Sequence, residues 1–218
     1  MTEVTEQQEA TLVYPDAIDI VSSLHSEVLP DPDTVSYYVL ENERKIYLES
    51  DVEPSVLGIQ KMIMRWNLED KRNGKTKETA KPIWIYIMSY GGDLDYMWAL
   101  IDAIEMSVTP VYTVNIGVAA SAASLIYVCG HKRFMAKHAT VVIHEGSAQL
   151  AGDAVKVQDA ADTYKKQLKQ MKDFILEHTG IPKSQLMKKR ANDWTLTADY
   201  CLKNHVCDQI ITDISDIL

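Results

Sequence analysis

The sequence predicts an α/β protein with mostly parallel strands, and three observations support this fold class. Apolar runs of strand length alternate with amphipathic segments of helix length from residue 44 onward. One run, Ile83–Ile87, is almost continuously apolar, as expected for a strand buried on both faces of a parallel sheet. The chain has 218 residues, 46% hydrophobic and 24% charged, which is enough for one sizeable core. We therefore expect one folded domain over residues 43–218.

The elements of the first half follow from local patterns, taken in chain order. Arg44–Leu48 predicts a short strand, and Glu53–Leu68 predicts a helix. The apolar residues of that helix recur every three or four positions, at Val56, Ile59, Ile63 and Trp66. The polar run Glu69–Ala80 predicts a surface loop, and Ile83–Ile87 predicts the buried strand that follows it.

The second half alternates in the same way. A helix is expected before Pro110, with its apolar face at Leu94, Met97, Trp98, Ile101 and Ile104. Val111–Ile116 predicts a strand, Ser121–Cys129 a compact helix, and Thr140–His144 a further strand. The longest helix is expected over Gly152–His178. Its apolar stripe contains Val157, Ala161, Tyr164, Leu168, Met171 and Ile175.

Charge divides the chain into an acidic N-terminal arm and a near-neutral body. Residues 1–53 hold thirteen acidic residues against Arg44 and Lys45, whereas residues 54–218 hold twenty basic and eighteen acidic residues. We expect residues 1–42 to form an acidic arm that is flexible or is ordered by a partner, and we assign it no regular structure. Because the sequence has no basic stripe that would bind a phosphate backbone, we expect no nucleic-acid partner.

The sequence also bears on localisation. Residues 1–43 contain no Lys or Arg, whereas secretory and mitochondrial targeting segments need basic residues, so we expect a cytoplasmic protein. The uncharged run 106–130 is long enough to suggest a membrane span. Pro110, Asn115 and two serines interrupt it, however, and it divides more naturally into a strand and a helix, so we expect no membrane association.

The three cysteines, Cys129, Cys201 and Cys207, are too few and too scattered for a disulfide framework. The spacing of the last two does not match a zinc site. We expect reduced thiols in the core, and neither a metal nor another cofactor.

One constellation favours nucleophilic catalysis. Ser121 lies among small residues between a predicted buried strand and the start of a helix, where unpaired N–H groups and the helix dipole favour a developing oxyanion. His144 closes a strand at the edge of the layer and is a candidate base. Asp193, in a polar stretch after the long helix, is a candidate carboxylate for orienting the imidazole. Taken singly, these residues are equally explained as a helix N-cap, an edge histidine and a loop acid.

Ordered motifs along the chain also match a known family. The run Ile83–Gly92 is similar to a strand that leads into a Ser-Pro-Gly-Gly turn, and Gly117–Ser121 to a Gly-x-Ala-Ala-Ser nucleophile motif. Gly130–Phe134 is similar to Gly-Lys-Arg-Phe, and Val142–His144 to a Met-Ile-His strand end. Thr179–Gly180 with the approach to Asp193, and then Ala198–Asp208, match as well. From about Arg44 to Ile211 the chain therefore resembles the ClpP family, the proteolytic subunits of the Clp (caseinolytic) protease.

The resemblance implies a role for each residue of the constellation. Ser121 would be the nucleophile, His144 the general base and acid, and Asp193 the group that holds the imidazole. The backbone N–H groups of Gly92 and Ala122 would form the oxyanion hole. This Ser-His-Asp order differs from that of other serine hydrolases, so the triad is recognised by role.

The resemblance also implies a fold and an assembly. The fold would be a ClpP/crotonase-like β-α-β superhelix, in which the segment Gly152–His178 forms the long handle helix. The protein would be a homo-oligomer of two stacked seven-membered rings, a tetradecamer, around a closed chamber. Its function would be that of a serine endopeptidase that degrades unfolded polypeptides fed to it by an ATP-dependent AAA+ unfoldase of the Clp family.

Several positions depart from the family pattern. Tyr90 replaces a usual Pro, Ala122 and Ala123 replace Met-Gly, and Glu145 with Gly146 replaces Gln-Pro. Ala122 keeps its backbone donor. We expect Glu145 to lie in solvent at the strand end, the alternative being a position beside the His144 ring. The acidic arm does not resemble the family's axial hairpin, which bears on docking of the unfoldase.

Two other functions compete with this one. A ring subunit with a vestigial triad would be structural or regulatory, but all three triad positions are occupied here. A crotonase-type acyl-CoA enzyme also holds an oxyanion with two backbone N–H groups, yet such enzymes seldom need a Ser/His pair.

Overall fold

The computed structural model describes residues 31–146, 149–189 and 192–218 and divides into two compact units, Met1–Glu43 and Arg44–Leu218. The described part of the first unit is helix α2 (Pro32–Asn42). The side chain of Asp31 caps this helix, and a proline occupies its first position. The helix lies in the arm for which we expected no regular structure. Residues 1–30 of that arm lie outside the described residues.

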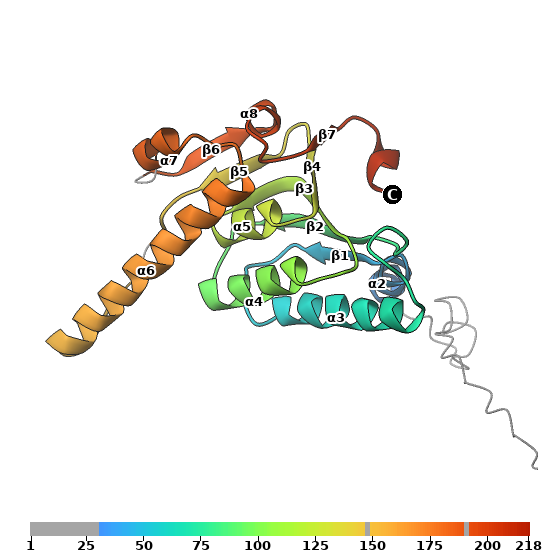
Figure 1. Cartoon of the computed structure of the whole chain (residues 1–218), viewed down its shortest axis with the longest axis horizontal. Helices are drawn as coiled ribbons and strands as arrows, with labels where there is room; N and C mark the ends of the chain where they lie inside the picture. The colour runs from blue at the N-terminus through green and yellow to red at the C-terminus, as the bar shows by residue number, and fades with distance from the viewer. Residues whose placement is uncertain (1–30, 147–148, 190–191) are drawn as a thin grey trace, which may run out of the picture. The chain divides into compact units, whose positions relative to one another are not determined.

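The described residues of the second unit form a seven-stranded sheet with helices (Figure 1). The elements are, in chain order, β1 (Lys45–Leu48), α3 (Val56–Arg72), β2 (Ile83–Ser89), α4 (Leu94–Glu105), β3 (Val111–Ala120), α5 (Ala122–Val128), β4 (Lys132–Ala136), β5 (Thr140–Ile143), α6 (Ala154–His178), α7 (Lys183–Lys189), β6 (Trp194–Thr197), α8 (Ala198–Lys203), β7 (Gln209–Ile211) and the 3₁₀ helix η1 (Ile214–Ile217). The strand order is β1-β2-β3-β4-β7, and β5 pairs with β3 and β6. The β5–β6 pair is antiparallel and the other pairs are parallel, which confirms the predicted fold class.

One edge of strand β3 pairs with β2, and the opposite edge pairs with two further strands. Its first half, Tyr112–Asn115, pairs with β4, and its last residues, Val118–Ala120, pair with β5. The side chain of Asn115 is fully buried between the two halves. It donates a hydrogen bond to the Thr140 carbonyl at 2.9 Å and accepts one from the Gly117 N–H at 3.1 Å. The buried amide of Asn115 thus holds β5 beside the last residues of β3, where the pairing of β3 with β4 has ended.

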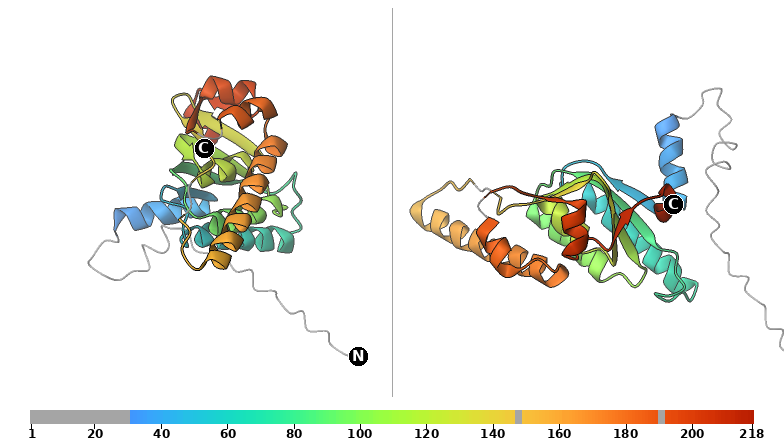
Figure 2. Two further views of the ribbon diagram at one scale, coloured as in Figure 1. Left: turned by 90° about the vertical axis from the view of Figure 1, so that its left-hand side faces the viewer. Right: turned by 90° about the horizontal axis from the view of Figure 1, so that it is seen from above.

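The main core lies between one face of the sheet and helices α3, α4 and α5 (Figures 1 and 2). Alternate residues of β2 point into it, namely Ile83, Ile85 and Ile87. The predicted face of α3 is buried there too. The other face of the sheet carries a smaller cluster of Tyr86, Val114, Phe134 and Ile217. The burial of β2 on both faces explains its nearly unbroken apolar sequence.

The long helix α6 is attached to this body at its C-terminal end (Figures 1 and 2). Its buried residues are Met171, Phe174 and Ile175, and residues 154–170, all described, contain none. Arg133 donates a hydrogen bond to the carbonyl of His178 at 2.6 Å, and the ring of His178 lies 3.0 Å from Glu105. Of the predicted apolar stripe, Met171 and Ile175 are thus buried, whereas the stripe residues nearer the start of the helix are only half-buried.

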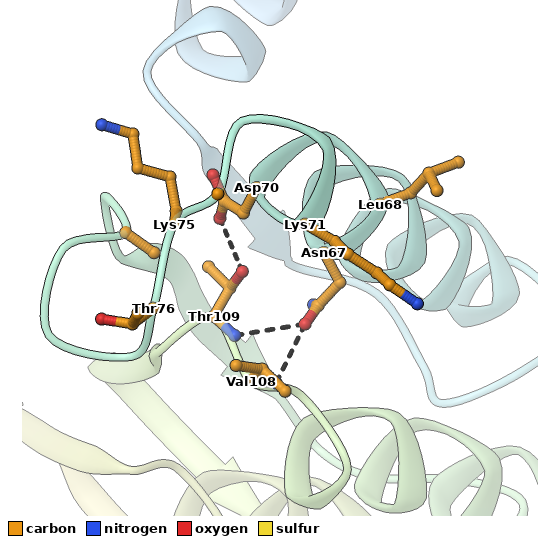
Figure 3. Close-up of a pocket in the computed structure, with 10 residues that line it drawn as sticks. Asn67, Leu68, Asp70, Lys71, Lys75, Thr76, Val108 and Thr109 are labelled. Carbon is orange, nitrogen blue, oxygen red and sulfur yellow. Dashed lines mark hydrogen bonds between the residues drawn. The ribbon is translucent and has the colours of Figure 1, made fainter.

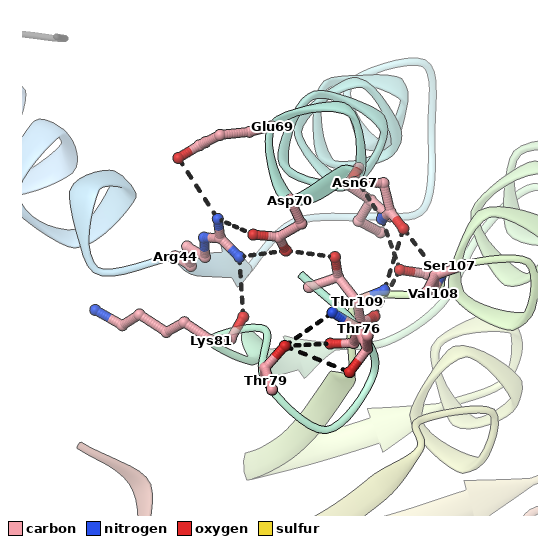
Figure 4. Close-up of polar contacts among 11 residues, drawn as sticks. Arg44, Asn67, Glu69, Asp70, Thr76, Thr79, Lys81, Ser107, Val108 and Thr109 are labelled. Atoms are coloured by element: carbon pink, nitrogen blue, oxygen red, sulfur yellow. Dashed lines mark hydrogen bonds and ion pairs between the residues drawn. The ribbon is translucent and has the colours of Figure 1, made fainter. Parts of the chain in front are cut away.

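The end of α3 corrects the predicted loop at Glu69–Ala80, because the helix continues to Arg72 and buries Asp70. Two nitrogens of Arg44 donate to the Asp70 carboxylate at 2.7 and 2.9 Å, and the Thr109 hydroxyl donates at 2.6 Å (Figure 4). Burial alone would raise the pKa of Asp70, but these hydrogen bonds and the Arg44 charge outweigh it and lower that pKa. The network ties the residue before β1 to α3 and to Thr109, two residues before β3.

The uncharged run at 106–130 forms β3 and α5 rather than a span. Across the described parts of the chain, none of the helices has both the length and the apolar content needed to cross a bilayer.

We predict that Asp70→Asn lowers the free energy of unfolding by about 3–5 kcal/mol, because it leaves the buried Arg44 guanidinium without its charge partner. That loss corresponds to a fall in Tm of roughly 10 °C in a thermal melt. Since folding lowers the pKa of Asp70, its contribution is present above the unfolded value of about 3.9 and is lost as the pH falls through the folded pKa. The variant should therefore lose less stability on acidification than the parent.

The control is Glu69→Gln, which removes the outer partner of the same arginine. Glu69 lies 3.6 Å from Arg44 and its side chain is 46% exposed, so its loss should cost less than about 1 kcal/mol. Equal melting temperatures for Asp70→Asn and Glu69→Gln would contradict the assignment of the buried pair.

Candidate active site

Ser121 stands between strand β3 and helix α5 in an unusual backbone conformation. Its φ is 52° and its ψ is −127°, which a residue other than glycine adopts at a cost of about 1–3 kcal/mol. Its N–H donates to the Val142 carbonyl of β5 at 2.9 Å. In the described chain its side chain makes no capping hydrogen bond to α5, so helix capping does not explain the serine. Ser121 instead stands in the turn between the end of β3 and the start of α5.

The peptide that follows Ser121 is fixed by Ser124. The Ser121 carbonyl accepts hydrogen bonds from the Ser124 N–H at 2.9 Å and from the Ser124 hydroxyl at 2.6 Å. The N–H of that same peptide belongs to Ala122, the first residue of α5, and the first N–H groups of a helix have no acceptor within it. Ser124 therefore sets the direction of the Ala122 N–H.

The Gly91–Gly92 turn packs directly on Ser121. Gly91 has a φ of 101°, and a Cβ placed on it would lie 2.6 Å from the Cβ of Ser121 and 2.9 Å from the nitrogen of Ala122. Val52 donates to the Gly91 carbonyl at 2.8 Å and accepts from the Asp93 N–H at 2.7 Å. These two hydrogen bonds involve the residues before and after Gly92, so neither of them uses the N–H of Gly92.

His144 and Asp193 are brought together by strand pairing. Strand β5 lies beside β3 in parallel, with Val142 opposite Ala120, so Ser121 and His144 both follow the carboxyl ends of neighbouring strands. The antiparallel pair β5–β6 places Trp194 opposite Ile143, which sets Asp193 beside His144. The Nδ1 of His144 lies 3.3 Å from an Asp193 oxygen. The His144 side chain is 33% exposed and that of Asp193 is 77% exposed.

The expectation that Glu145 lies in solvent is wrong. Its side chain is 30% exposed, and Oε1 lies 3.6 Å from the Nζ of Lys172 on helix α6. The hydroxyl of Tyr164, also on α6, donates to the Glu145 carbonyl at 2.9 Å. These two contacts thus connect the residue after His144 to helix α6.

Four residues around the site were missed by the sequence analysis. Ser89 donates to the Ser50 carbonyl at 2.6 Å and accepts from the Gly91 N–H at 3.2 Å, which supports the glycine turn. The others are Ser124, Tyr164 and Lys172. The two serines lie within or beside the motifs, so a search for hydroxyls there would have found them. Tyr164 and Lys172 carry no local signal, because their partner is 19 and 27 residues away.

The cysteines are poor nucleophiles. In the described chain Cys129, Cys201 and Cys207 are buried and free, as expected. Burial raises the pKa of Cys201 to about 12 and that of Cys207 to about 11, so neither thiolate is populated near neutral pH. Among the described residues, no group of three His, Cys, Asp or Glu side chains is placed to hold a metal.

A hollow in the described structure lies away from Ser121. Its volume is about 410 Å³, and it lies between the end of α3 and the loop before β3 (Figure 3). Asn67 and Thr109 line it, and their polar side-chain atoms are occupied by hydrogen bonds to Val108, Thr109 and Asp70. It therefore lies at the amino end of β3, whereas Ser121 follows the carboxyl end of that strand.

Comparisons with known proteins identify the family of the chain. A sequence model of the family described as Clp protease matches residues 33–213. The chain is 32% identical over 140 residues to the ATP-dependent Clp protease proteolytic subunit 2 of Treponema denticola, covering 63% of this chain and 70% of that protein. It is 30% identical over 189 residues to the proteolytic subunit 1 of Chlamydia caviae, covering 85% and 95%. It is 27% identical over 177 residues to the proteolytic subunit of Dehalococcoides mccartyi, covering 80% and 85%. The chain belongs to the Clp protease family.

Proposed function

We propose that this chain is the serine endopeptidase subunit of a ring-shaped, chambered protease that degrades unfolded polypeptides. One observation carries the proposal: Ser121, held at a φ of 52° between strand and helix, stands at the same sheet edge as a His144 that contacts Asp193. Family membership supports the same reaction.

The proposed chemistry gives each residue one task. The Ser121 hydroxyl attacks the peptide carbonyl while His144 takes its proton, and His144 then returns that proton to the leaving amine. Asp193 holds the imidazole through its Nδ1. The N–H groups of Gly92 and Ala122 stabilise the oxyanion of the tetrahedral intermediate. Water then hydrolyses the acyl-enzyme by the same route.

The proposal includes an energy-dependent partner. The relatives named above are subunits of ATP-dependent proteases. An AAA+ unfoldase of the Clp family would deliver unfolded chains to this particle in the cytoplasm, since a closed chamber does not admit folded proteins.

We predict that Ser121→Ala abolishes cleavage of short peptides and of unfolded polypeptides. Loss of a triad nucleophile lowers kcat by about 10⁴–10⁶. The measurement is turnover of a fluorogenic peptide, together with labelling by a fluorophosphonate probe, which should mark the parent and not the variant. Turnover that persists in Ser121→Ala would refute the proposal. A parent that neither cleaves nor reacts with the probe would favour a structural ring subunit or an acyl-CoA enzyme.

We also predict that Gly91→Ala lowers kcat by at least about tenfold, because the added methyl would displace Ser121 and the Ala122 N–H that holds the oxyanion. The matched control is Gly117→Ala on the neighbouring strand. A Cβ there would lie 3.4 Å from the flexible side chain of Met88, so its kcat should stay within about twofold of the parent. Equal losses in the two variants would contradict this role of Gly91.

Assembly is the third prediction of this proposal. Residues 154–170 of α6 contain no buried residue, and a side chain as apolar as Val155 is 71% exposed there. A second copy that packs on this segment would remove that apolar surface from water. Light scattering at micromolar concentration should show a particle of many subunits, two stacked seven-membered rings. A monomer at physiological salt would contradict this prediction.

A further inference from the structure

Two side chains of α6 hold one residue, and that residue directly follows His144. Tyr164 donates to the Glu145 carbonyl at 2.9 Å, and Lys172 lies 3.6 Å from the Glu145 carboxylate. Tyr164 and Lys172 are eight positions apart, about 12 Å along the helix, so the two contacts come from different turns of one face. Both the backbone and the side chain of Glu145 are thereby fixed to α6.

The packing around these contacts is close. A cavity of only about 20 Å³ remains between α6 and the residues that end β5, which is room for about one water molecule. It is lined by Ile143, His144, Glu145, Leu168, Met171, Lys172, Ile175 and Leu186. Gly146 has a φ of 74°, and a Cβ placed on it would lie 3.4 Å from the Tyr164 oxygen. The chain therefore turns tightly over Tyr164 just after Glu145.

The contact to Asp193 holds His144 only weakly, so contacts from α6 can add to the positioning of this residue. The Asp193 side chain is 77% exposed, and its oxygen lies 3.3 Å from Nδ1 of His144. An ion pair or hydrogen bond to so exposed a carboxylate is weakened by solvent. The Lys172 and Glu145 side chains are only 23% and 30% exposed. The better protected contacts to the His144 segment are those from α6.

We propose that the Glu145–Lys172 ion pair, together with the Tyr164 hydroxyl, positions His144 by holding the peptide after it against α6. The inference rests on the proposed function and adds positioning residues to it, since none of the three touches the reacting atoms. Loss of a positioning contact lowers the fraction of enzyme in which the imidazole meets Ser121. It leaves the binding of the peptide unchanged, so kcat falls and KM does not.

The experiment measures kcat and KM for a fluorogenic peptide, with thermal melts of every variant. Glu145→Gln and Lys172→Gln each break the pair, and Tyr164→Phe removes a hydroxyl without changing charge or shape. We expect kcat to fall about tenfold in the first two and about threefold in the third, with KM within twofold of the parent. Exchanging the partners, Glu145→Lys with Lys172→Glu, should recover most of the lost kcat.

The matched control is Lys169→Gln. Lys169 pairs with Asp173 at 2.6 Å on the same helix, and its side chain is 76% exposed, so its kcat should equal that of the parent. Unchanged kcat in both single variants would overturn the inference, as would a loss that follows the melting temperature or is not recovered by the exchange. Ser121→Ala in the same assay separates the two proposals. If turnover does not depend on Ser121, the proposed function falls and this inference with it, whereas Ser121-dependent turnover that ignores Glu145 and Lys172 overturns the inference alone.

Discussion

The pairing of one edge of strand β3 with two different strands, β4 and β5, decides where each part of the candidate site lies. Asn115 stabilises this branch, because its buried amide is satisfied only while the Thr140 carbonyl and the Gly117 N–H stay in place. Once β5 lies beside β3, Ser121 and His144 follow the ends of adjacent parallel strands. The antiparallel strand β6 then continues the same register and brings Asp193 to His144.

The site is built more from backbone than from side chains. Ser121 and Gly91 both have positive φ values, and their close approach is supported by Ser124 on one side and by Ser89 and Val52 on the other. The hydrogen bonds among these residues are 2.6–3.2 Å long, whereas the contact proposed to orient the imidazole is 3.3 Å long and lies near the surface. In the proposed mechanism, this arrangement fixes the nucleophile and the oxyanion donors more firmly than the base. Because the base is held less firmly, the contacts from α6 to the residue after His144 matter more for the position of the imidazole.

Local periodicity predicted the layers of the fold well, because a strand buried on both faces and a helix with one apolar face leave plain patterns. It also led to Ser121 and His144, which lie next to such patterns, and Asp193 was a candidate only because it lies in a polar stretch after the long helix. Contacts across long sequence separations were not predictable in this way. From the sequence alone Asp70 is predicted to be a surface acid, because its partner Arg44 lies 26 residues earlier in the chain. Glu145 is likewise predicted to be an exposed residue at the strand end, because its partner Lys172 lies on α6, far along the chain.

The backbone of Ser121 also restricts which side chains this position accepts. A φ of 52° crowds the Cβ of any residue other than glycine, and a second heavy atom on Cβ makes that crowding far worse. Threonine would carry the same hydroxyl but would force the strand-to-helix turn to relax, whereas cysteine keeps a single branch and fits the turn. With Ser121 as the proposed nucleophile, the backbone at this turn therefore accepts cysteine in its place more readily than threonine, so the backbone geometry limits which nucleophile this chain can carry here.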